Sequence, residues 1–189
     1  MSSDSLHERG KALEDRFFQE RDKLLLEKMR EEFENRTARE ALSGACGITD
    51  EQVLNDLLHN QITAETLTAI SIVPLVAVGW ADDTLEPKEI DAILRATHDI
   101  GIKEGTNTFE LVRSWLKNKP DQELLDTWKK YVVALRSKLP ESSFEQLKSN
   151  VIGRARGVAQ SAGGFLGLGS KISSVEKQVL EDLESAFSA

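Results

Sequence analysis

Apolar residues recur at helical spacing along almost the whole chain, and the strict alternation typical of β-strands is rare. After residue 40 the charge density falls, and residues that can cap helices follow one another at short intervals. We expect capped helix starts at Thr49 and Thr63, and further helices at about residues 86–101, 106–117, 121–138, 141–162 and from 174 onward. The pattern therefore predicts an all-α fold of seven to eight helices around a single core.

The first 40 residues differ from the rest, and we expect them to form a long charged helical extension on a folded domain of residues 41–189. Both charge signs are dense from residue 6 to residue 36, and opposite charges recur four residues apart, as at Glu32 and Arg36. The apolar residues fall into two stripes, which are Leu6, Leu13, Phe17 and Leu24, and then Phe18, Leu25, Met29 and Phe33. Together the stripes are wider than one helix face needs. We therefore expect residues 6–36 to bind a protein partner or a second copy of the chain, with Phe17, Phe18 and Leu25 as anchors.

The longest apolar run, residues 69–81, contains about 13 residues and is interrupted by Pro74, whereas a membrane-spanning helix needs about 20. This run predicts a buried helix with a kink near Pro74 and no insertion into a membrane. The N-terminal residues lack the apolar core of a secretory signal, so the sequence favours a cytoplasmic protein.

Composition and charge narrow the function classes. The net charge is −8 and the pI is near 5.0, whereas nucleic acids and anionic membranes attract a basic face. The single cysteine, Cys46, excludes an internal disulfide and is expected to be a small buried thiol. The acidic charge therefore predicts no nucleic-acid partner. No Ser/His/Asp or Cys/His arrangement stands out, so we expect a protein that is not an enzyme.

The stretch ADDTLEPKE places four carboxylates directly after the most apolar run, at Asp82, Asp83, Glu86 and Glu89. One interpretation is a helix start, since Pro87 suits the first helical position and the positive end of the helix dipole favours acidic side chains. The other is a weak site for Ca²⁺ or Mg²⁺ formed by Asp82, Asp83 and Glu89, with Glu86 secondary, because hard cations prefer carboxylate oxygens. The spacing does not fit an EF-hand loop, and both interpretations stay open.

A weak internal repeat relates this stretch to a later one. LEPKEIDAIL, from residue 85, and ISSVEKQVLE, from residue 172, each have an apolar residue, a cap position and a glutamate three residues after the cap. Ser173 with Glu176 fits a capping box well, and Glu86 with Glu89 fits less well. The repeat predicts two similar helix corners.

A glycine-rich turn, GGFLGLGSK at residues 163–171, precedes the second copy of the repeat. It matches neither GxGxxG nor GxxxxGK[ST], so we do not interpret it as a phosphate-binding loop. Its glycines permit tight turns with Phe165 and Leu166 folded inward. The alternative is that Phe165 and Leu166 form an exposed tip that binds a partner.

Two segments of residues 41–189 resemble the TerB-like proteins of the tellurite-resistance and stress-response group. LVAVGWADDTLEPKEIDAILRATHDIGI is similar to the acidic corner of that family, and GGFLGLGSKISSVEKQVLEDLESAF is similar to the matching corner near the end of its fold. Asp82 and Glu89 match the family pattern, whereas Asp83 stands where glycine is usual. The resemblance implies an all-α domain, usually non-enzymatic, with an acidic corner proposed to bind a divalent cation or a partner.

The segment GKALEDRFFQERDKLLLEKMREE, from residue 10, resembles the helix of the ATPase inhibitor family. In that family a charged helix with paired aromatic residues inserts between subunits of a rotary ATPase. The resemblance implies a regulatory interaction protein with Phe17 and Phe18 as anchors. The sequence thus leaves two hypotheses, a TerB-like binding module and a protein that acts through its N-terminal helix.

Overall fold

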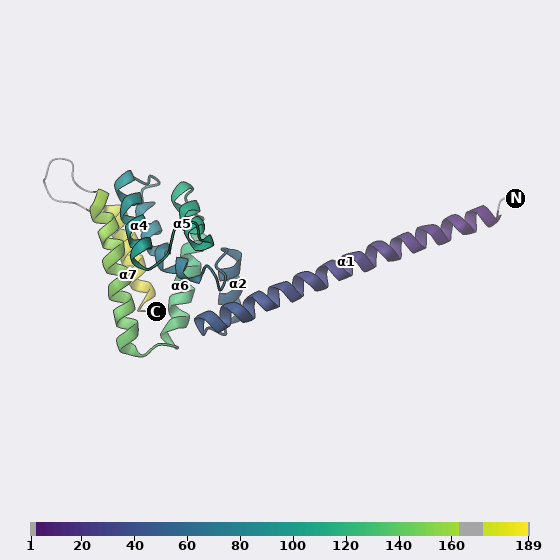
Figure 1. Cartoon of the computed structure of the whole chain (residues 1–189), viewed down its shortest axis with the longest axis horizontal. Coiled ribbons are helices and arrows are strands. Elements are labelled where there is room, and N and C mark those ends of the chain that lie inside the picture. The colour runs from purple at the N-terminus through teal and green to yellow at the C-terminus, as the bar shows by residue number, and fades with distance from the viewer. Residues whose placement is uncertain (1–2, 163–171, 189) are drawn as a thin grey trace. The chain divides into compact units, whose positions relative to one another are not determined.

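The computed structural model describes the backbone of residues 3–162 and 172–188, and the side chains of residues 25–161 and 172–188 (Figure 1). Its helices are α1 (Ser3–Cys46), α2 (Glu51–His59), the 3₁₀ helix η1 (Leu67–Ile72), α3 (Val73–Gly79), α4 (Pro87–Asp99), α5 (Asn107–Lys117), α6 (Gln122–Arg136), α7 (Glu141–Ala162) and α8 (Ser174–Ala186). Within these residues there is no β-strand, so the all-α prediction is confirmed. The chain separates into two compact units, Met1–Glu40 and Ala41–Ala189, and each is described by itself.

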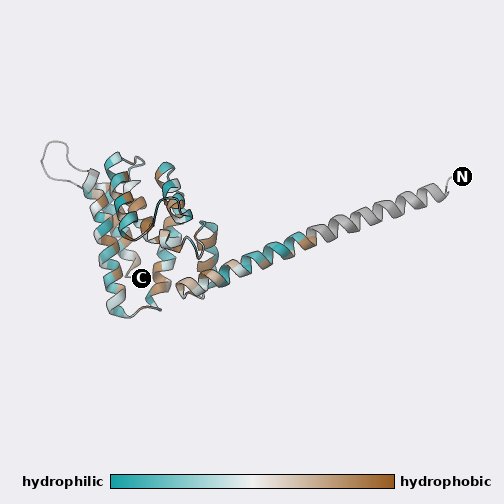
Figure 2. Cartoon of the chain, viewed as in Figure 1, coloured by the Kyte–Doolittle hydropathy of each residue, from teal (hydrophilic) through white to brown (hydrophobic). Residues whose placement is uncertain are grey.

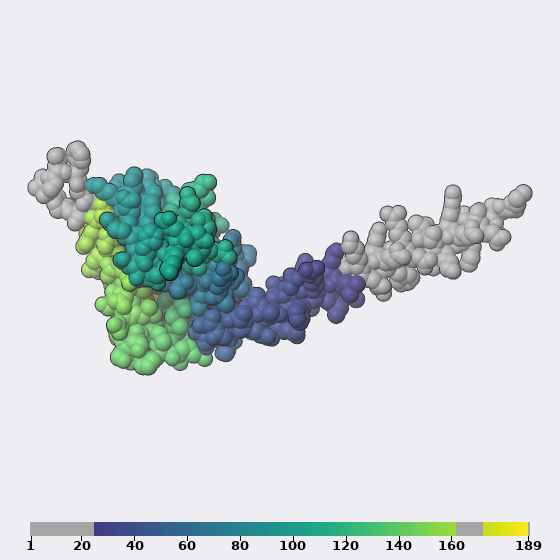
Figure 3. Space-filling view, in the orientation of Figure 1, coloured from purple at the N-terminus to yellow at the C-terminus, as the bar shows by residue number. Residues whose placement is uncertain are grey.

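The first unit is a single helix, the part of α1 that ends at Glu40. Arg30 Nε donates to Glu34 Oε1 at 2.8 Å one turn along, and Arg36 lies 3.8 Å from Glu40 in the same relation. Such pairs contribute only about 0.2–0.5 kcal/mol each. Four apolar side chains of this helix are 56–66% exposed, namely Leu25, Leu26, Met29 and Phe33. Figure 2 shows apolar and polar residues intermixed along the coloured part of this helix, and Figure 3 shows the same residues in space-filling form.

The second unit has one hydrophobic core, with α3 at its centre. This helix packs against η1, α4, α6, α7 and α8. The side chains of Val73, Leu75, Val76 and Val78 are all buried, because each face of the helix meets a neighbour. A helix that is apolar on every side is typical of such a central position. The position of α3 therefore sets the positions of the helices around it.

Gly79, the last residue of α3, allows the chain to turn closely against α4. A Cβ atom at this position would lie 2.5 Å from Leu85 Cδ1 and 3.3 Å from Ile93 Cδ1. Ile93 is buried on α4, and Leu85 packs against the core just before α4 begins. The missing side chain at residue 79 thus lets the acidic stretch lie close to the core.

The apolar run of residues 69–81 is not the single kinked helix that its sequence suggests. Residues 67–72 form η1, and α3 begins only afterwards, with Pro74 in its first turn. Proline is tolerated there because the first N–H groups of a helix have no partner within the helix. None of the helices in residues 3–162 and 172–188 has the length and apolar character required to cross a membrane.

Two predicted helix caps are also corrected. Asp50 caps α2 in place of Thr49, and its side chain accepts a hydrogen bond from Val53 N at 3.0 Å. Thr63 and Thr66 exchange hydrogen bonds as in a capping box, with Thr63 N donating to Thr66 Oγ1 at 2.8 Å, but the chain continues as a turn and then as η1, so no α-helix begins at Thr63. Aspartate and threonine are both good caps, so the sequence pattern alone does not choose between neighbouring candidates.

The later helix starts agree with the sequence. Thr106 Oγ1 accepts a hydrogen bond from Phe109 N at 3.2 Å at the start of α5. Ser173 Oγ accepts one from Glu176 N at 3.1 Å at the start of α8, and α7 spans Glu141–Ala162. The repeat predicted two capped corners, and both α4 and α8 begin at such corners.

Candidate functional site

The acidic stretch forms the turn between α3 and α4. Asp82 Oδ1 accepts a hydrogen bond from Thr84 N at 3.0 Å, which closes the turn locally. The carboxylate of Asp83 forms an ion pair with Lys119, and Lys119 Nζ also donates to the backbone oxygen of Trp80 at 3.1 Å. Lys119 lies just before α6, so its ammonium ties the turn to a distant part of the chain.

The backbone of Asp83 is left-handed, with a φ of +66°. This conformation is uncommon for any residue other than glycine, although aspartate tolerates it better than most. The aspartate supplies a carboxylate for Lys119 that glycine would lack, at some conformational cost.

Glu86 is the N-cap residue of α4, and Glu89 is the third residue of the helix. The backbone N–H of Glu86 donates to Glu89 Oε2 at 2.8 Å, as in a capping box. Glu86 is exposed, whereas the Glu89 side chain is buried, with 3% of the residue exposed. The helix-start interpretation of this stretch is therefore confirmed, and its four carboxylates lie in four different environments.

Glu89 has a counterpart in Glu176, the third residue of α8. The N–H of Ser173 donates to Glu176 Oε2 at 2.6 Å, and Glu176 is also buried, with 8% exposed. Burial raises the pKa of Glu89 to about 7, against the bond from Glu86 N–H, which lowers it. The negative charge of Glu176 raises the Glu89 pKa further, and Glu86 and Asp82 add to this effect. The two corners of the repeat thus place the carboxylate of Glu176 close enough to Glu89 for its negative charge to act on it.

The carboxylates do not gather into a metal-binding group. In the part of the chain that the structure describes, no three Asp, Glu, His or Cys side chains are placed to hold one ion. Asp83 is engaged by Lys119, and Glu89 by Glu86 N–H. The cation site at Asp82, Asp83 and Glu89, with Glu86 secondary, stays a prediction.

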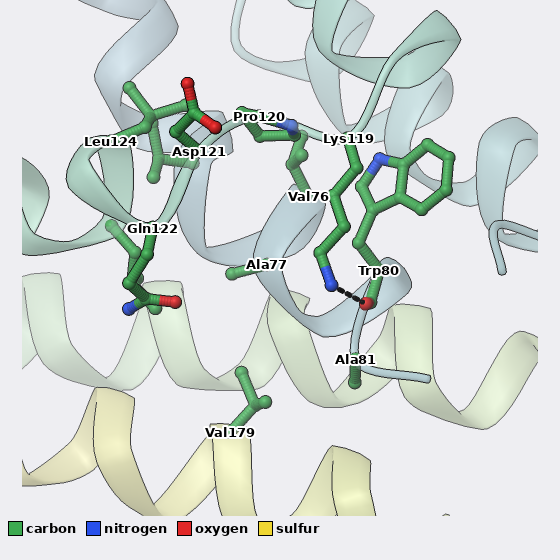
Figure 4. A pocket seen from close by; sticks show the side chains of 12 residues that line it. Val76, Ala77, Trp80, Ala81, Lys119, Pro120, Asp121, Gln122, Leu124 and Val179 are labelled. Carbon is green, nitrogen blue, oxygen red and sulfur yellow. Dashed lines mark hydrogen bonds between the residues drawn. The ribbon is translucent and has the colours of Figure 1, made fainter. Parts of the chain in front are cut away.

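A pocket of about 160 Å³ lies beside this corner (Figure 4). Its walls come from α3, from the segment before α6, from α6 and from α8. The apolar lining residues are Val73, Val76, Ala77, Trp80, Ala81, Pro120, Leu124, Leu125 and Val179. Three polar residues, Lys119, Asp121 and Gln122, complete the lining. An engineered apolar cavity of similar volume, roughly 150 Å³, accepts benzene in another protein, so the space suits one small apolar group.

The pocket and the acidic corner share residues and fixed contacts. Trp80 Nε1 donates to the backbone oxygen of Trp115 at 2.9 Å, which holds the indole ring as a wall. Lys119 lines the pocket and binds both Trp80 O and Asp83. The site is therefore supported by α3 and by the hydrogen bonds of Trp80 and Lys119 rather than by a free loop. Such support favours a preformed shape.

Of the predicted partner-binding residues, the structure describes the side chain of Leu25 alone. Leu25 is exposed on α1, in the first unit. The side chains of Phe17 and Phe18, and the whole of Phe165 and Leu166, lie outside the described residues. Cys46 is half-buried rather than fully buried.

Sequence reasoning did not find the pocket. Lys119, Asp121 and Val179 are far from the acidic stretch in sequence, and nothing in their local pattern marks them as lining residues. The capping-box repeat did point to Glu176, but the closeness of Glu176 to Glu89 depends on tertiary packing. No family model, curated protein or solved structure matches this chain. The TerB-like and ATPase-inhibitor resemblances therefore stay predictions.

Proposed function

We propose that residues 41–189 form a non-enzymatic binding module that holds one apolar side chain of a partner protein in the pocket beside the acidic corner. The observation that carries this proposal is the pocket of about 160 Å³ whose walls include Trp80, Ala77 and Val179. The pocket adjoins the acidic corner, since Lys119 lines the pocket and pairs with Asp83 of the corner.

The size and lining of the pocket favour a branched aliphatic group. Burial of a leucine-sized side chain contributes roughly 1.5–3 kcal/mol, which suffices for an anchor but not for a complete interface. The polar side chains at Gln122 and Asp121 can accept hydrogen bonds from the N–H groups that flank such an anchor. The site thus suits a side chain presented by a polypeptide.

Charge favours a partner with a basic residue near the anchor. Lys119 is neutralised by Asp83, whereas the Asp121 side chain makes no capping hydrogen bond with α6. The rim therefore retains a negative charge, in keeping with the net charge of −8 of the whole chain. A lysine or arginine next to the anchor would be attracted to Asp121.

The lining gives no support to a catalytic role. Its polar members, Lys119, Asp121 and Gln122, include no serine, cysteine or histidine that could form a nucleophile–base pair. A divalent cation at the corner, a rotary ATPase as partner and a role in stress or tellurite resistance stay predictions.

The test is an amide NMR titration of the full chain with N-acetyl-leucine methylamide, and in parallel with N-acetyl-alanine methylamide. The two probes differ only in the isobutyl group, so saturable shifts at the lining residues with the leucine probe alone would support the proposal. We expect weak binding, in the millimolar range or above, because a single side chain carries little contact area.

Ala77→Leu is the blocking variant, since residue 77 lines the pocket on α3. Ala134→Leu makes the same change at another half-buried helical position, on α6, and serves as the control. If Ala77→Leu fails to fold, Val179→Ala enlarges the pocket instead and should shift the preference toward N-acetyl-phenylalanine methylamide. Equal shifts with the alanine and leucine probes, or leucine shifts that persist in a folded Ala77→Leu protein, would refute the proposal.

A further inference from the structure

The first unit carries a row of exposed apolar side chains on one side of α1, which we call its apolar face. Leu25, Met29 and Phe33 follow one another at four-residue spacing on α1, and each is more than half exposed. Leu26 widens the face on one side. Helical stability in proteins comes mainly from packing of such a face, and the exposed pairs Arg30–Glu34 and Arg36–Glu40 contribute little.

Charged positions lie at both ends of this face. By helical spacing, residue 22 precedes Leu25 on the same face and residue 36 follows Phe33. Residue 22 is an aspartate and residue 36 an arginine, so the face reads acidic, apolar, apolar, apolar, basic. The guanidinium of Arg36 lies 5.4 Å from the centre of the Phe33 ring, next to the apolar part.

This order is self-complementary in one orientation only. When two such faces meet antiparallel about Met29, Leu25 of one copy faces Phe33 of the other, and residue 22 faces residue 36 twice. When they meet in parallel and in register, aspartate faces aspartate and arginine faces arginine, which is unfavourable. An antiparallel pair has two-fold symmetry, the commonest arrangement of self-associating proteins.

We propose that two copies of this chain pair antiparallel through α1, with Met29 on the two-fold axis and Leu25, Leu26 and Phe33 buried between the helices. The interface consists of the first unit, so it is independent of the pocket and of the function proposed for it.

The first test is sedimentation equilibrium of the full chain over a range of concentrations. We expect a reversible monomer–dimer equilibrium that Phe33→Glu abolishes. Asn35→Glu adds the same charge at an exposed position off the face and should leave the dimer intact. A wild-type chain that stays monomeric at several hundred micromolar overturns the proposal and leaves the face to a different protein.

A charge exchange tests the orientation. Arg36→Asp alone and Asp22→Arg alone should each raise the dimer dissociation constant, by about tenfold, because like charges then face each other at both ends. The double variant restores opposite charges and should bring the constant back toward the wild-type value. Failure of the double variant to recover, with both single variants impaired, contradicts the antiparallel pairing.

Cysteine cross-linking gives an independent readout, in a chain that carries Cys46→Ser. Met29→Cys should form an interchain disulfide with itself, because residue 29 lies on the axis. Leu25→Cys should not cross-link with itself but should do so when mixed with Phe33→Cys. Efficient self-linking of Leu25→Cys would show a parallel pair and refute the proposal.

Discussion

Glu89 and Glu176 occupy the same position, the third residue, in α4 and α8, and each accepts a hydrogen bond from the backbone N–H of its own helix cap. Both are buried, and the charge of Glu176 adds to the effect of burial in raising the pKa of Glu89. The internal repeat thus places a second acid where its charge makes ionisation of Glu89 less favourable. This relationship gives the fold a pH dependence that can be measured.

We expect the free energy of unfolding to fall between about pH 4.5 and pH 7. The Glu89 pKa is about 7 in the folded chain and 4.5 for an ordinary glutamate, so the folded state holds its proton more tightly than the unfolded state. The stability from this proton is fully present below about pH 4.5 and is lost as the pH rises through 7. The loss is on the order of 3 kcal/mol.

Urea unfolding of the wild type and of Glu89→Gln across this pH range isolates the contribution. Glutamine can still accept the bond from Glu86 N–H but does not ionise, so the two proteins should be similar near pH 5, and the variant should be the more stable at pH 8. Stability curves that run parallel from pH 5 to pH 8 would show that Glu89 titrates normally.

Gly79→Ala should destabilise the fold by up to about 1 kcal/mol, because the new Cβ would lie 2.5 Å from Leu85 Cδ1, which must turn aside, and 3.3 Å from Ile93 Cδ1. Gly153→Ala is the matched control. That glycine is exposed within α7, and a Cβ there meets nothing within 4 Å, so alanine should stabilise by about 0.5–1 kcal/mol. Thermal unfolding of both variants measures the difference, and equal effects would contradict the close packing at residue 79.

Asp83→Ala should destabilise by about 1–2 kcal/mol, because alanine is strained at a φ of +66° and lacks the carboxylate for Lys119. Asp83→Gly relieves the strain while losing the same ion pair, so we expect it to be close to wild type. Urea denaturation separates the two variants. A glycine variant as unstable as the alanine variant would mean that the ion pair, not the backbone, matters here.

If the four carboxylates serve only as a helix start, Ca²⁺ or Mg²⁺ at millimolar concentration and fixed ionic strength should produce no saturable amide NMR shifts at residues 81–89. Asp83 is engaged by Lys119, and Glu89 is buried against Glu86 N–H, so a cation would have to displace existing contacts. Saturable shifts that disappear when Asp82, Asp83 and Glu89 are replaced by Asn, Asn and Gln would establish the predicted cation site instead.

The sequence predicts a helix start well where a glutamate three residues later completes a capping box, as at Ser173 with Glu176. It does less well where two cap residues adjoin, as at Thr49 and Asp50, because both can accept the same N–H. The division of the apolar run near Pro74 depends on packing against neighbouring helices, which leaves no local pattern.

The pocket is the clearest case of information that local sequence does not contain. Ala77, Lys119 and Val179 come from three separate segments, and only the packing of the core brings them together. The acidic stretch is conspicuous in sequence, whereas the hollow beside it is defined by ordinary apolar residues.

Lys119 links two places that have so far been considered in turn, since the ammonium that lines the pocket also holds Asp83 in its left-handed backbone. An occupant that draws this ammonium away from Asp83 and Trp80 O would release a turn whose backbone favours another conformation. Occupancy of the pocket would then change the conformation of the exposed turn at Asp83, and a partner that contacts this turn could detect the change.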